Sequence, residues 1–167
     1  MRVGVGYDVH PLTRGRRLVL GGVEIPYDKG LDGYSDADVL IHAIIDALLG
    51  AAALGDIGTH FPSSEPKYKD VSSVTLLRQT GDLLHTRGWQ IGNIDATIVA
   101  EQPPLSPLIP RMRQVIAETL GIGVDQVGVK STTSKGLGFL GQGEGIAAHA
   151  VALVRKAEAH RDQGGMK

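Results

Sequence analysis

The sequence contains no cysteine, which excludes disulfide bonds and thiolate metal sites and leaves histidine, aspartate and glutamate as the available metal ligands. Aromatic residues are scarce, at 4% of the 167 residues. Glycine is abundant, and its 23 occurrences predict many tight turns and close backbone approaches.

Strong charge of either sign is also missing, because the formal net charge is −1. Bulk electrostatics therefore predict no binding to nucleic acid or to a membrane surface. No signal-like apolar segment precedes Asp8, so we expect a cytoplasmic protein. The length predicts one domain with a real core over residues 1–157, followed by a frayed tail at 158–167.

Hydrophobic periodicity and turn signals predict a series of strands and helices. The apolar segment from Asp36 to Leu54 is expected to be a buried helix, capped by Ser35 or Asp36 and too short to span a membrane. Residues 146–154 fit either a strand or a helix. The other expected strands lie at 2–9, 17–27 with a Gly-Gly turn, 89–101 and 125–133, and the other expected helices lie at 72–88 and 111–121.

A carboxylate and an imidazole stand two positions apart in "GVGYDVHP", at the end of the first expected strand. Residues i and i+2 of a strand point to the same face, so Asp8 and His10 could be two ligands of one metal ion. Such a site needs a third ligand. His42 is a candidate because it lies on the buried helix, with Asp46 on the same helix face as a possible orienting partner. A simple His–Asp hydrogen bond in the core is the alternative.

The glycine-rich segment "GLGFLG" matches a dinucleotide-binding pattern, but the chain ends before the further strand that such a fold needs. The preceding segment "KSTTSK", residues 130–135, combines four hydroxyl groups with two lysines. Hydroxyls and backbone N–H groups in a tight turn suit a phosphate, although a plain polar turn is the alternative.

Five segments together resemble the 2-C-methyl-D-erythritol 2,4-cyclodiphosphate synthase family: "GYDVH", "GGVEIP", "SDADVLIHAIIDALLGAAALGDIGTHFP", "GNIDATIVAEQP" and "VKSTTSKGLGFLGQGEGIAAHAVAL". The resemblance runs in order and without gaps from about Arg2 to Lys156. It implies an α+β subunit, with a mixed sheet covered by helices on one side, in which 146–154 is a strand. Three subunits would pack their sheets inward as a homotrimer, with active sites between neighbours.

The resemblance also implies the chemistry. The 2-phosphate of 4-diphosphocytidyl-2-C-methyl-D-erythritol 2-phosphate would attack the β-phosphorus and release CMP, giving a cyclic diphosphate. One Zn²⁺ per subunit, bound by Asp8, His10 and His42, would act as a Lewis acid, and Mg²⁺ or Mn²⁺ would bridge the substrate phosphates. Because both reacting groups are anionic, positive charge and in-line positioning would supply most of the catalysis.

By the same resemblance, Tyr34 and Thr133 would be catalytic, and loops around Tyr34 and 61–71 would form a lid. The methylerythritol part would contact Asp56, Ile57, Gly58, Phe61, Pro62, Ser63, Ser64 and Glu65. The other substrate contacts would come from Asp8, Val9, His10, Tyr34, Ser35, Ala100, Pro104, Leu105, Ser131, Thr132, Thr133, Ser134, Lys135, Phe139 and Gln142.

The chain departs from the family pattern at four of these positions. Tyr34 replaces a His, Pro104 a Lys, Gln142 an Arg, and Lys135 the Glu that binds the second metal ion. We expect the Lys135 ammonium to take over part of the charge neutralisation. The alternative is that Lys135 points to solvent while phosphates and water hold the second ion.

A non-catalytic relative that binds zinc and phosphorylated ligands is the second functional hypothesis. A zinc hydrolase is the third, with Asp46 as a badly placed base.

Overall fold

The computed structural model describes residues 1–157, and the tail predicted at 158–167 lies outside the described residues. The strands are β1 (Arg2–Arg14), β2 (Leu18–Leu20), β3 (Val23–Ile25), β4 (Lys29–Leu31), β5 (Trp89–Val99), β6 (Val127–Thr132) and β7 (Gly145–Lys156). The helices are α1 (Val39–Ala52), α2 (Ile57–His60), α3 (Ser73–Thr86), α4 (Ile109–Leu120) and α5 (Gly138–Gly141), with short 3-10 turns at 66–68, 106–108 and 124–126.

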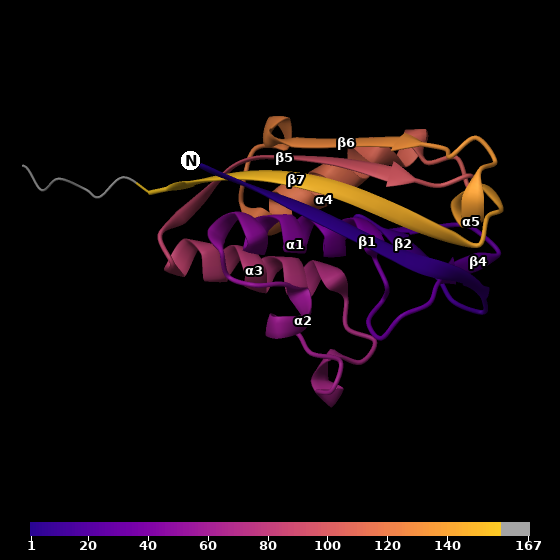
Figure 1. Cartoon of the computed structure of the whole chain (residues 1–167), viewed down its shortest axis with the longest axis horizontal. Coiled ribbons are helices and arrows are strands. Elements are labelled where there is room, and N and C mark those ends of the chain that lie inside the picture. The colour runs from indigo at the N-terminus through magenta and orange to yellow at the C-terminus, as the bar shows by residue number, and fades with distance from the viewer. Residues whose placement is uncertain (158–167) are drawn as a thin grey trace, which may run out of the picture.

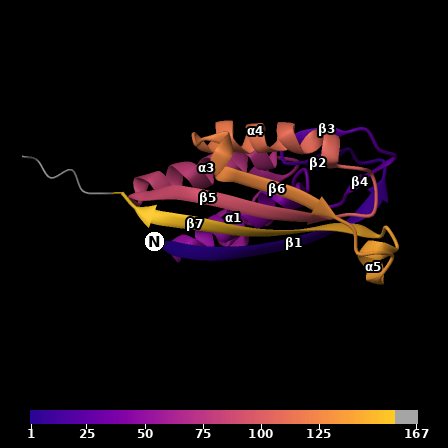
Figure 2. The ribbon, with the colours of Figure 1, turned by 90° about the horizontal axis from the view of Figure 1, so that it is seen from above.

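A five-stranded mixed sheet in the order β4-β1-β7-β5-β6 forms one layer, and α1, α3 and α4 lie on one of its faces (Figure 1, Figure 2). β7 lies between β1 and β5 and runs antiparallel to both, whereas β6 runs parallel to β5. α1 packs against β1 and β7, α4 against β6, and α3 against α1. The expected α+β subunit, with helices covering one side of a mixed sheet, is confirmed.

Two glycines of β1 allow α1 to lie directly against the strand. A Cβ atom on Gly6 would stand 1.9 Å from the backbone oxygen of Ala43, and one on Gly4 would stand 2.0 Å from that of Ala47. Hydrogen is therefore the only side chain that fits at either position. α1 is buried on nearly every side, as predicted, and carries His42 over the strand. No helix within residues 1–157 is long and apolar enough to cross a membrane.

α1 begins three residues later than predicted, and its N-cap is Asp38. The Asp38 carboxylate accepts the backbone N–H of Ile41 at 3.1 Å. The prediction that Ser35 or Asp36 caps the helix was wrong, because Ala37 has a φ of 56° and turns the chain before the helix starts. This leaves Ser35 and Asp36 in the loop before α1, where their side chains bind other partners.

Several other segments follow the predicted pattern only in part. The strand expected at 17–27 is a hairpin of β2 and β3, turning at Gly21 and Gly22, both of which have positive φ. β1 continues past residue 9 as far as Arg14. The ambiguous residues 146–154 lie within strand β7, which confirms the family-based expectation. The expected loops after α1 and after β6 contain the short helices α2 and α5.

The face of the sheet opposite the helices carries an apolar stripe from β1. Val3, Val5, Tyr7 and Val9 alternate with the helix-facing residues of the strand. Val3 and Val5 are 64% and 70% exposed, and Val151 of the neighbouring β7 is also exposed. Exposed valines on adjacent strands are typical of a surface that packs against another protein.

Candidate active site

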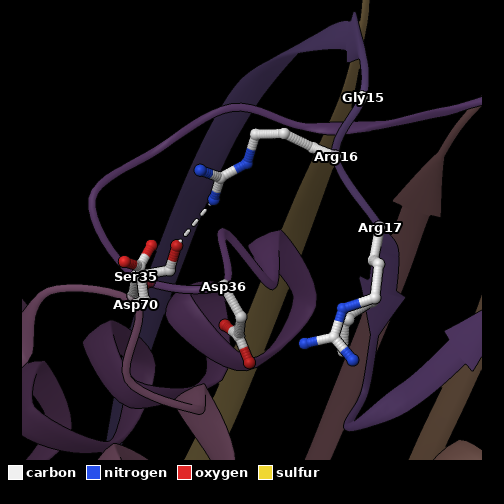
Figure 3. Close-up of a pocket in the computed structure, with 7 residues that line it drawn as sticks. Gly15, Arg16, Arg17, Ser35, Asp36 and Asp70 are labelled. Carbon is white, nitrogen blue, oxygen red and sulfur yellow. Dashed lines mark hydrogen bonds between the residues drawn. The ribbon is translucent and has the colours of Figure 1, made fainter.

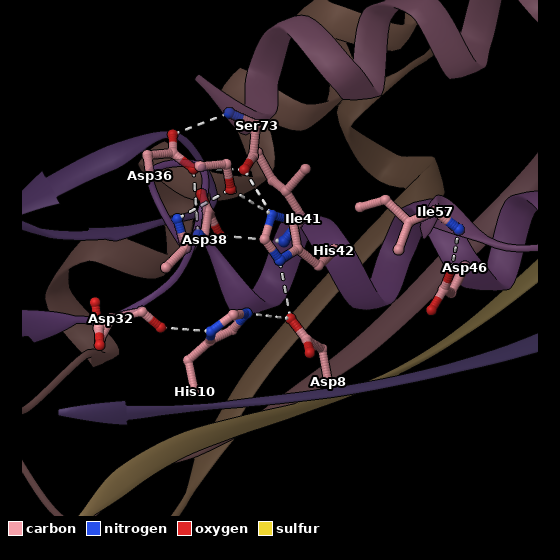
Figure 4. A network of polar contacts seen from close by, with 12 residues as sticks. Asp8, His10, Asp32, Asp36, Asp38, Ile41, His42, Asp46, Ile57 and Ser73 are labelled. Atoms are coloured by element: carbon pink, nitrogen blue, oxygen red, sulfur yellow. Dashed lines mark hydrogen bonds and ion pairs between the residues drawn. The ribbon is translucent and has the colours of Figure 1, made fainter. Parts of the chain in front are cut away.

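Asp8, His10 and His42 form a cluster in which one ligand atom from each residue lies within 4.8 Å of the others (Figure 4). The two β1 residues project from the same face of the strand, and His42 reaches them from α1. Asp8 Oδ2 lies 3.1 Å from His10 Nε2 and 2.9 Å from His42 Nδ1. The prediction that these three residues meet is confirmed.

Mutual electrostatics favour the charged forms of Asp8 and His10. Burial opposes ionisation of Asp8, but hydrogen bonds with His10 and His42 outweigh that effect and lower the pKa of its carboxyl group. Burial likewise opposes protonation of His10, but the hydrogen bond and the charge of Asp8 raise the pKa of the imidazole. Asp8 therefore stays an ionised carboxylate, which is the form that binds a metal ion.

Each imidazole is held through its other nitrogen. His10 Nδ1 donates to the backbone oxygen of Asp32 at 2.7 Å, and His42 Nε2 lies 2.8 Å from the hydroxyl oxygen of Ser73. His10 Nε2 and His42 Nδ1 are thereby directed towards Asp8. Two imidazole nitrogens and one carboxylate suit a tetrahedral Zn²⁺ site with a fourth position open.

Asp46 does not orient His42 as the sequence suggested. Its Oδ1 accepts the backbone N–H of Ile57 at 2.8 Å, and both nitrogens of His42 have other partners. The side chain of Asp46 points towards the start of α2, where the N–H of Ile57 lies (Figure 4). Burial and the nearby charge of Asp56 raise the pKa of Asp46.

A cavity of about 240 Å³ opens beside the cluster. It is lined by Asp8, His10 and His42 together with Tyr34, Ser35, Asp46, Ile57, Gly58, Phe61, Ser63, Tyr68 and Leu76. The aromatic rings of Phe61 and Tyr68 meet edge to face at 5.6 Å and form part of an apolar wall. Tyr68 falls within the expected 61–71 lid but was not predicted as a lining residue, and Leu76 was not predicted at all, because nothing in their local pattern distinguishes them from ordinary packing residues.

Four residues expected at this end of the substrate do not line the cavity: Asp56, Pro62, Ser64 and Glu65. The Asp56 carboxylate instead caps α2 by accepting the N–H of Thr59 at 2.8 Å. The backbone oxygen of Glu65 accepts the Tyr34 hydroxyl at 3.3 Å, which links the two expected lid loops.

Arg16 holds the loop between β4 and α1, a role that the sequence did not reveal. Its Nε donates to the backbone oxygen of Leu31 at 2.9 Å, and its Nη2 donates to that of Ser35 at 2.8 Å (Figure 3). This loop also carries Tyr34 and the carbonyl of Asp32 that binds His10. Its partners lie 15 and 19 positions away, so no local pattern marks Arg16 as a site residue.

The predicted phosphate-binding segment, residues 130–135, lies at the carboxyl end of β6, beside the end of β5, and its residues 131–135 form the 131–135 turn. The N–H of Ala100 donates to Thr132 O at 3.0 Å and joins the two segments. Glu101, which was not predicted, accepts hydrogen bonds at Oε1 from the backbone N–H groups of Ser134 and Gly136, at 2.8 Å and 3.3 Å. These bonds, with the nearby Lys135 charge, lower the pKa of Glu101.

The remaining predicted residues at this end differ in exposure. Leu105 is buried, whereas Pro104 is exposed and Phe139 is half exposed. Gln142 Nε2 donates to the backbone oxygen of Gly136 at 3.3 Å and so supports the same turn. Lys135 is exposed and has a φ of 57°.

Within a single chain, the metal-binding cluster and the 131–135 turn lie apart. β1 and β6 are separated by β7 and β5, which amounts to three strand spacings, or roughly 14 Å. Val9, Ala147, Val99 and Thr132 are successive partners across the sheet and share its open face. Asp8 lies on the opposite face, beneath α1, so Asp8 and Thr132 point away from opposite sides of the sheet.

Comparison with known proteins gives the family of the chain. The model of the YgbB family matches residues 1–155. The chain belongs to the YgbB family. A relative from Syntrophomonas wolfei, named 2-C-methyl-D-erythritol 2,4-cyclodiphosphate synthase, is 60% identical over 157 residues, covering 94% of this YgbB-family chain and 100% of the relative. The family resemblance drawn from the motifs is therefore confirmed.

Solved structures agree with that assignment. The chain matches the bifunctional IspDF from Campylobacter jejuni with a TM-score of 0.90 at 39% identity, covering 94% of this chain and 42% of that longer one. It matches a CDP complex of IspF from Plasmodium falciparum with a TM-score of 0.83 at 32% identity. That match covers 94% of this YgbB-family chain and 97% of the other.

Proposed function

We propose that this chain converts 4-diphosphocytidyl-2-C-methyl-D-erythritol 2-phosphate to 2-C-methyl-D-erythritol 2,4-cyclodiphosphate with release of CMP, a lyase reaction of the non-mevalonate isoprenoid route in the cytoplasm. The observation that carries this proposal is the Asp8–His10–His42 cluster beside a cavity of about 240 Å³. It occurs in a chain whose full-length relatives bear the name of that synthase.

The ion in this proposal is Zn²⁺, held by Asp8, His10 and His42. Two imidazole nitrogens and a carboxylate of lowered pKa support this choice, since such mixed donor sets with an open position are typical of catalytic zinc. When bound, the ion would supply Lewis-acid polarisation of a phosphate oxygen. The chain itself orients both imidazoles and keeps Asp8 ionised.

The residues of the cavity suit the methylerythritol part of the substrate. Phe61, Ile57 and Leu76 offer apolar surface, and the hydroxyls of Tyr34, Ser35 and Ser63 offer hydrogen-bond donors. In this proposal the Asp56–Gly58 segment and the loop up to Glu65 hold that part in place. The Tyr34 hydroxyl, which donates to the backbone oxygen of Glu65 in this structure, would change partner to stabilise charge that develops near the metal-binding cluster.

The nucleotide end of the substrate is assigned to the ends of β5 and β6. Ala100, Pro104 and Leu105 would form the cytidine pocket, with the hydroxyls of residues 131–134 on the phosphates and Thr133 at the developing charge. Phe139 and Gln142 would complete this end. A second ion, Mg²⁺ or Mn²⁺, would bridge the phosphates, with the Lys135 ammonium supplying part of the positive charge.

A homotrimer would complete the active site. Its support is the position of the 131–135 turn, which follows a strand roughly 14 Å from the strand of Asp8, with Thr132 on the other face of the sheet. The exposed valines of β1 and β7 give a second reason for subunits to pack through this open face. In the proposed trimer the metal-binding cluster of one subunit faces the turn of its neighbour.

The activity can be tested with the purified protein, the diphosphocytidyl substrate, Mg²⁺ and Zn²⁺. We expect CMP release together with a cyclic diphosphate, followed by nucleotide chromatography and ³¹P NMR. His42→Ala should abolish turnover, whereas His85→Ala, which changes an exposed histidine of α3, should leave turnover unchanged. CMP release with an open-chain product would show a hydrolase instead.

The assembly can be tested by mixing two inactive variants. His42→Ala and Thr133→Ala should each be inactive alone, and refolding them together should restore part of the activity, because a mixed trimer contains an intact site between subunits. Complementation that fails in verified mixed trimers would contradict a shared site.

A non-catalytic relative is the alternative function, and the replacements at Tyr34 and Lys135 are the observations that motivate it. A protein that binds zinc and CDP but releases no CMP would support this alternative.

A further inference from the structure

Beyond the three predicted ligands, a second layer of polar residues stands behind His42. His42 Nε2 lies 2.8 Å from Ser73 Oγ, and the Ser73 hydroxyl donates to Asp36 Oδ1 in a short hydrogen bond. Asp36 Oδ2 accepts the backbone N–H of Ser73 at 2.9 Å, which fixes the carboxylate with both oxygens (Figure 4). Ser73 is fully buried, and His42 is 8% exposed.

The direction of these hydrogen bonds follows from proton counting. A serine hydroxyl has one proton, and here that proton goes to the Asp36 carboxylate, which can only accept. The Ser73 oxygen therefore offers only lone pairs to His42. An acceptor facing Nε2 requires the proton on Nε2, so Nδ1, which faces the Asp8 carboxylate at 2.9 Å, is the nitrogen that would present its lone pair to a bound metal ion.

Ser35 does not change this direction. Its hydroxyl oxygen lies 3.2 Å from His42 Nε2, farther than Ser73, and it already accepts the N–H of Ala37 at 3.2 Å. Ser35 has a second lone pair with which it can share the Nε2 proton, and the nearer Ser73 oxygen is the main partner of Nε2. The buried Asp36 carboxylate and Ser73 hydroxyl together determine that Nε2 is the nitrogen of His42 that keeps its proton.

We propose that Asp36 and Ser73 are positioning residues that fix the His42 tautomer with Nδ1 free to ligate the metal ion. The proposal rests on the metal binding proposed above. It gives α3 a role in the active site, because Ser73 is the first residue of that helix, and it explains why Asp36 does not cap α1. A buried partner that orients a metal-bound imidazole is typically worth 10- to 100-fold in metal affinity.

The test compares Ser73→Ala with Ser72→Ala. Ser72 precedes Ser73, is exposed, and makes no capping hydrogen bond with its side chain, so it controls for the loss of a serine at this helix end. Zinc affinity is measured without substrate by competition with a chelating dye. We expect Ser73→Ala to bind zinc roughly 10- to 100-fold more weakly than the wild type, and Ser72→Ala to bind it unchanged.

A second readout follows the proton itself. In the zinc-loaded wild type, long-range ¹H–¹⁵N NMR should show a slowly exchanging proton on His42 Nε2, and this signal should broaden or vanish in Ser73→Ala. Asp36→Asn provides an independent variant if Ser73→Ala does not fold. Its amide can donate to Ser73 and reverse the chain of hydrogen bonds, so it should also weaken zinc binding.

The outcomes separate this proposal from the proposed function. Folded Ser73→Ala with wild-type zinc affinity and a protected Nε2 proton would overturn the positioning role, even if the enzyme turns over substrate. Weaker zinc binding in Ser73→Ala and Asp36→Asn would support the role, even if no CMP is released. A wild type that binds no zinc would overturn both.

Discussion

His42 Nδ1 lies 2.9 Å from a carboxylate oxygen of Asp8, although 34 positions of sequence separate the two residues. The contact depends on the close approach of α1 to β1, which Gly4 and Gly6 permit. The geometry of the candidate metal site therefore depends directly on how closely α1 packs against β1. Four predictions follow from this and from the neighbouring contacts.

The first prediction concerns Gly6. Gly6→Ala would place a methyl group 1.9 Å from the backbone oxygen of Ala43, which cannot rotate away. Overpacking of this kind should lower the free energy of unfolding by about 3 kcal/mol and weaken zinc binding, since α1 must shift. Urea unfolding and a zinc titration measure the two effects.

Gly50→Ala is the control for the Gly6 variant. Its added carbon would meet nothing closer than 3.9 Å, so the free energy of unfolding should stay equal or rise by up to about 1 kcal/mol. Equal stability of both variants would contradict the packing argument.

The second prediction concerns Arg16, which donates to the backbone oxygens of Leu31 and Ser35. Arg16→Ala should destabilise the protein by about 2 kcal/mol and weaken zinc binding, because the loop that Arg16 holds also positions His10.

Arg17→Ala is the matched control for Arg16→Ala. Arg17 is exposed and pairs with Glu24 on the surface, so its loss should cost less than about 1 kcal/mol. Thermal unfolding and zinc competition separate the two variants. The loop argument fails if both arginines prove equally dispensable.

The third prediction concerns the second cation. Lys135→Glu restores a carboxylate at the end of the 131–135 turn, beside Glu101, and removes a positive charge. Turnover should then depend more steeply on Mg²⁺ concentration than in the wild type, as initial rates over a Mg²⁺ series would show. Arg78→Glu makes the same change of charge at an exposed site on α3 and should leave the Mg²⁺ curve unchanged. An unaltered curve in Lys135→Glu would mean that Lys135 points to solvent without effect.

The fourth prediction concerns pH. The pKa of His10 is raised above its ordinary value of 6.5 despite burial, because Asp8 stabilises the imidazolium. In metal-free protein this pair therefore stabilises the fold fully below about pH 6.5, and the stabilisation is lost as the pH rises through the folded-state pKa. The stability difference between the wild type and His10→Gln should shrink over that range in urea unfolding.

Zinc binding should show the opposite trend, since His10 must lose its proton to ligate. Zinc affinity of the wild type should therefore increase as the pH rises above 6.5. His85→Gln serves as the control in both series, because His85 is exposed and far along α3. A stability difference that grows with pH would refute the assigned pairing of Asp8 with His10.

Much of the fold could be predicted because the relevant signals are local. The two-residue spacing of Asp8 and His10 placed them on one strand face, and the apolar run around His42 marked a buried helix. The family resemblance added what periodicity could not, namely that residues 146–154 form a strand. The helix start was missed because several capping residues stand side by side in "SDAD", and only the backbone turn at Ala37 selects Asp38.

The supporting residues of the site could not be predicted, for a common physical reason. Ser73 meets Asp36 across 37 positions, and Glu101 meets Ser134 across 33. Each is an ordinary polar residue at a helix end or in a loop, and its partner is chosen by the tertiary fold. Asp46 shows the converse case. It had the right spacing to face His42, but the N–H of Ile57 at the start of α2 engages its carboxylate instead.

The missing side chains of Gly4 and Gly6 have a practical consequence. β1 supplies two of the metal ligands and also packs directly against the buried helix α1. A small displacement of α1 would therefore change the metal–ligand distances and weaken binding of the cation. Metal affinity could then be used to compare variants of the protein core, including substitutions far from any substrate. A variant that binds the metal as well as the wild type would have preserved the packing of α1 against β1.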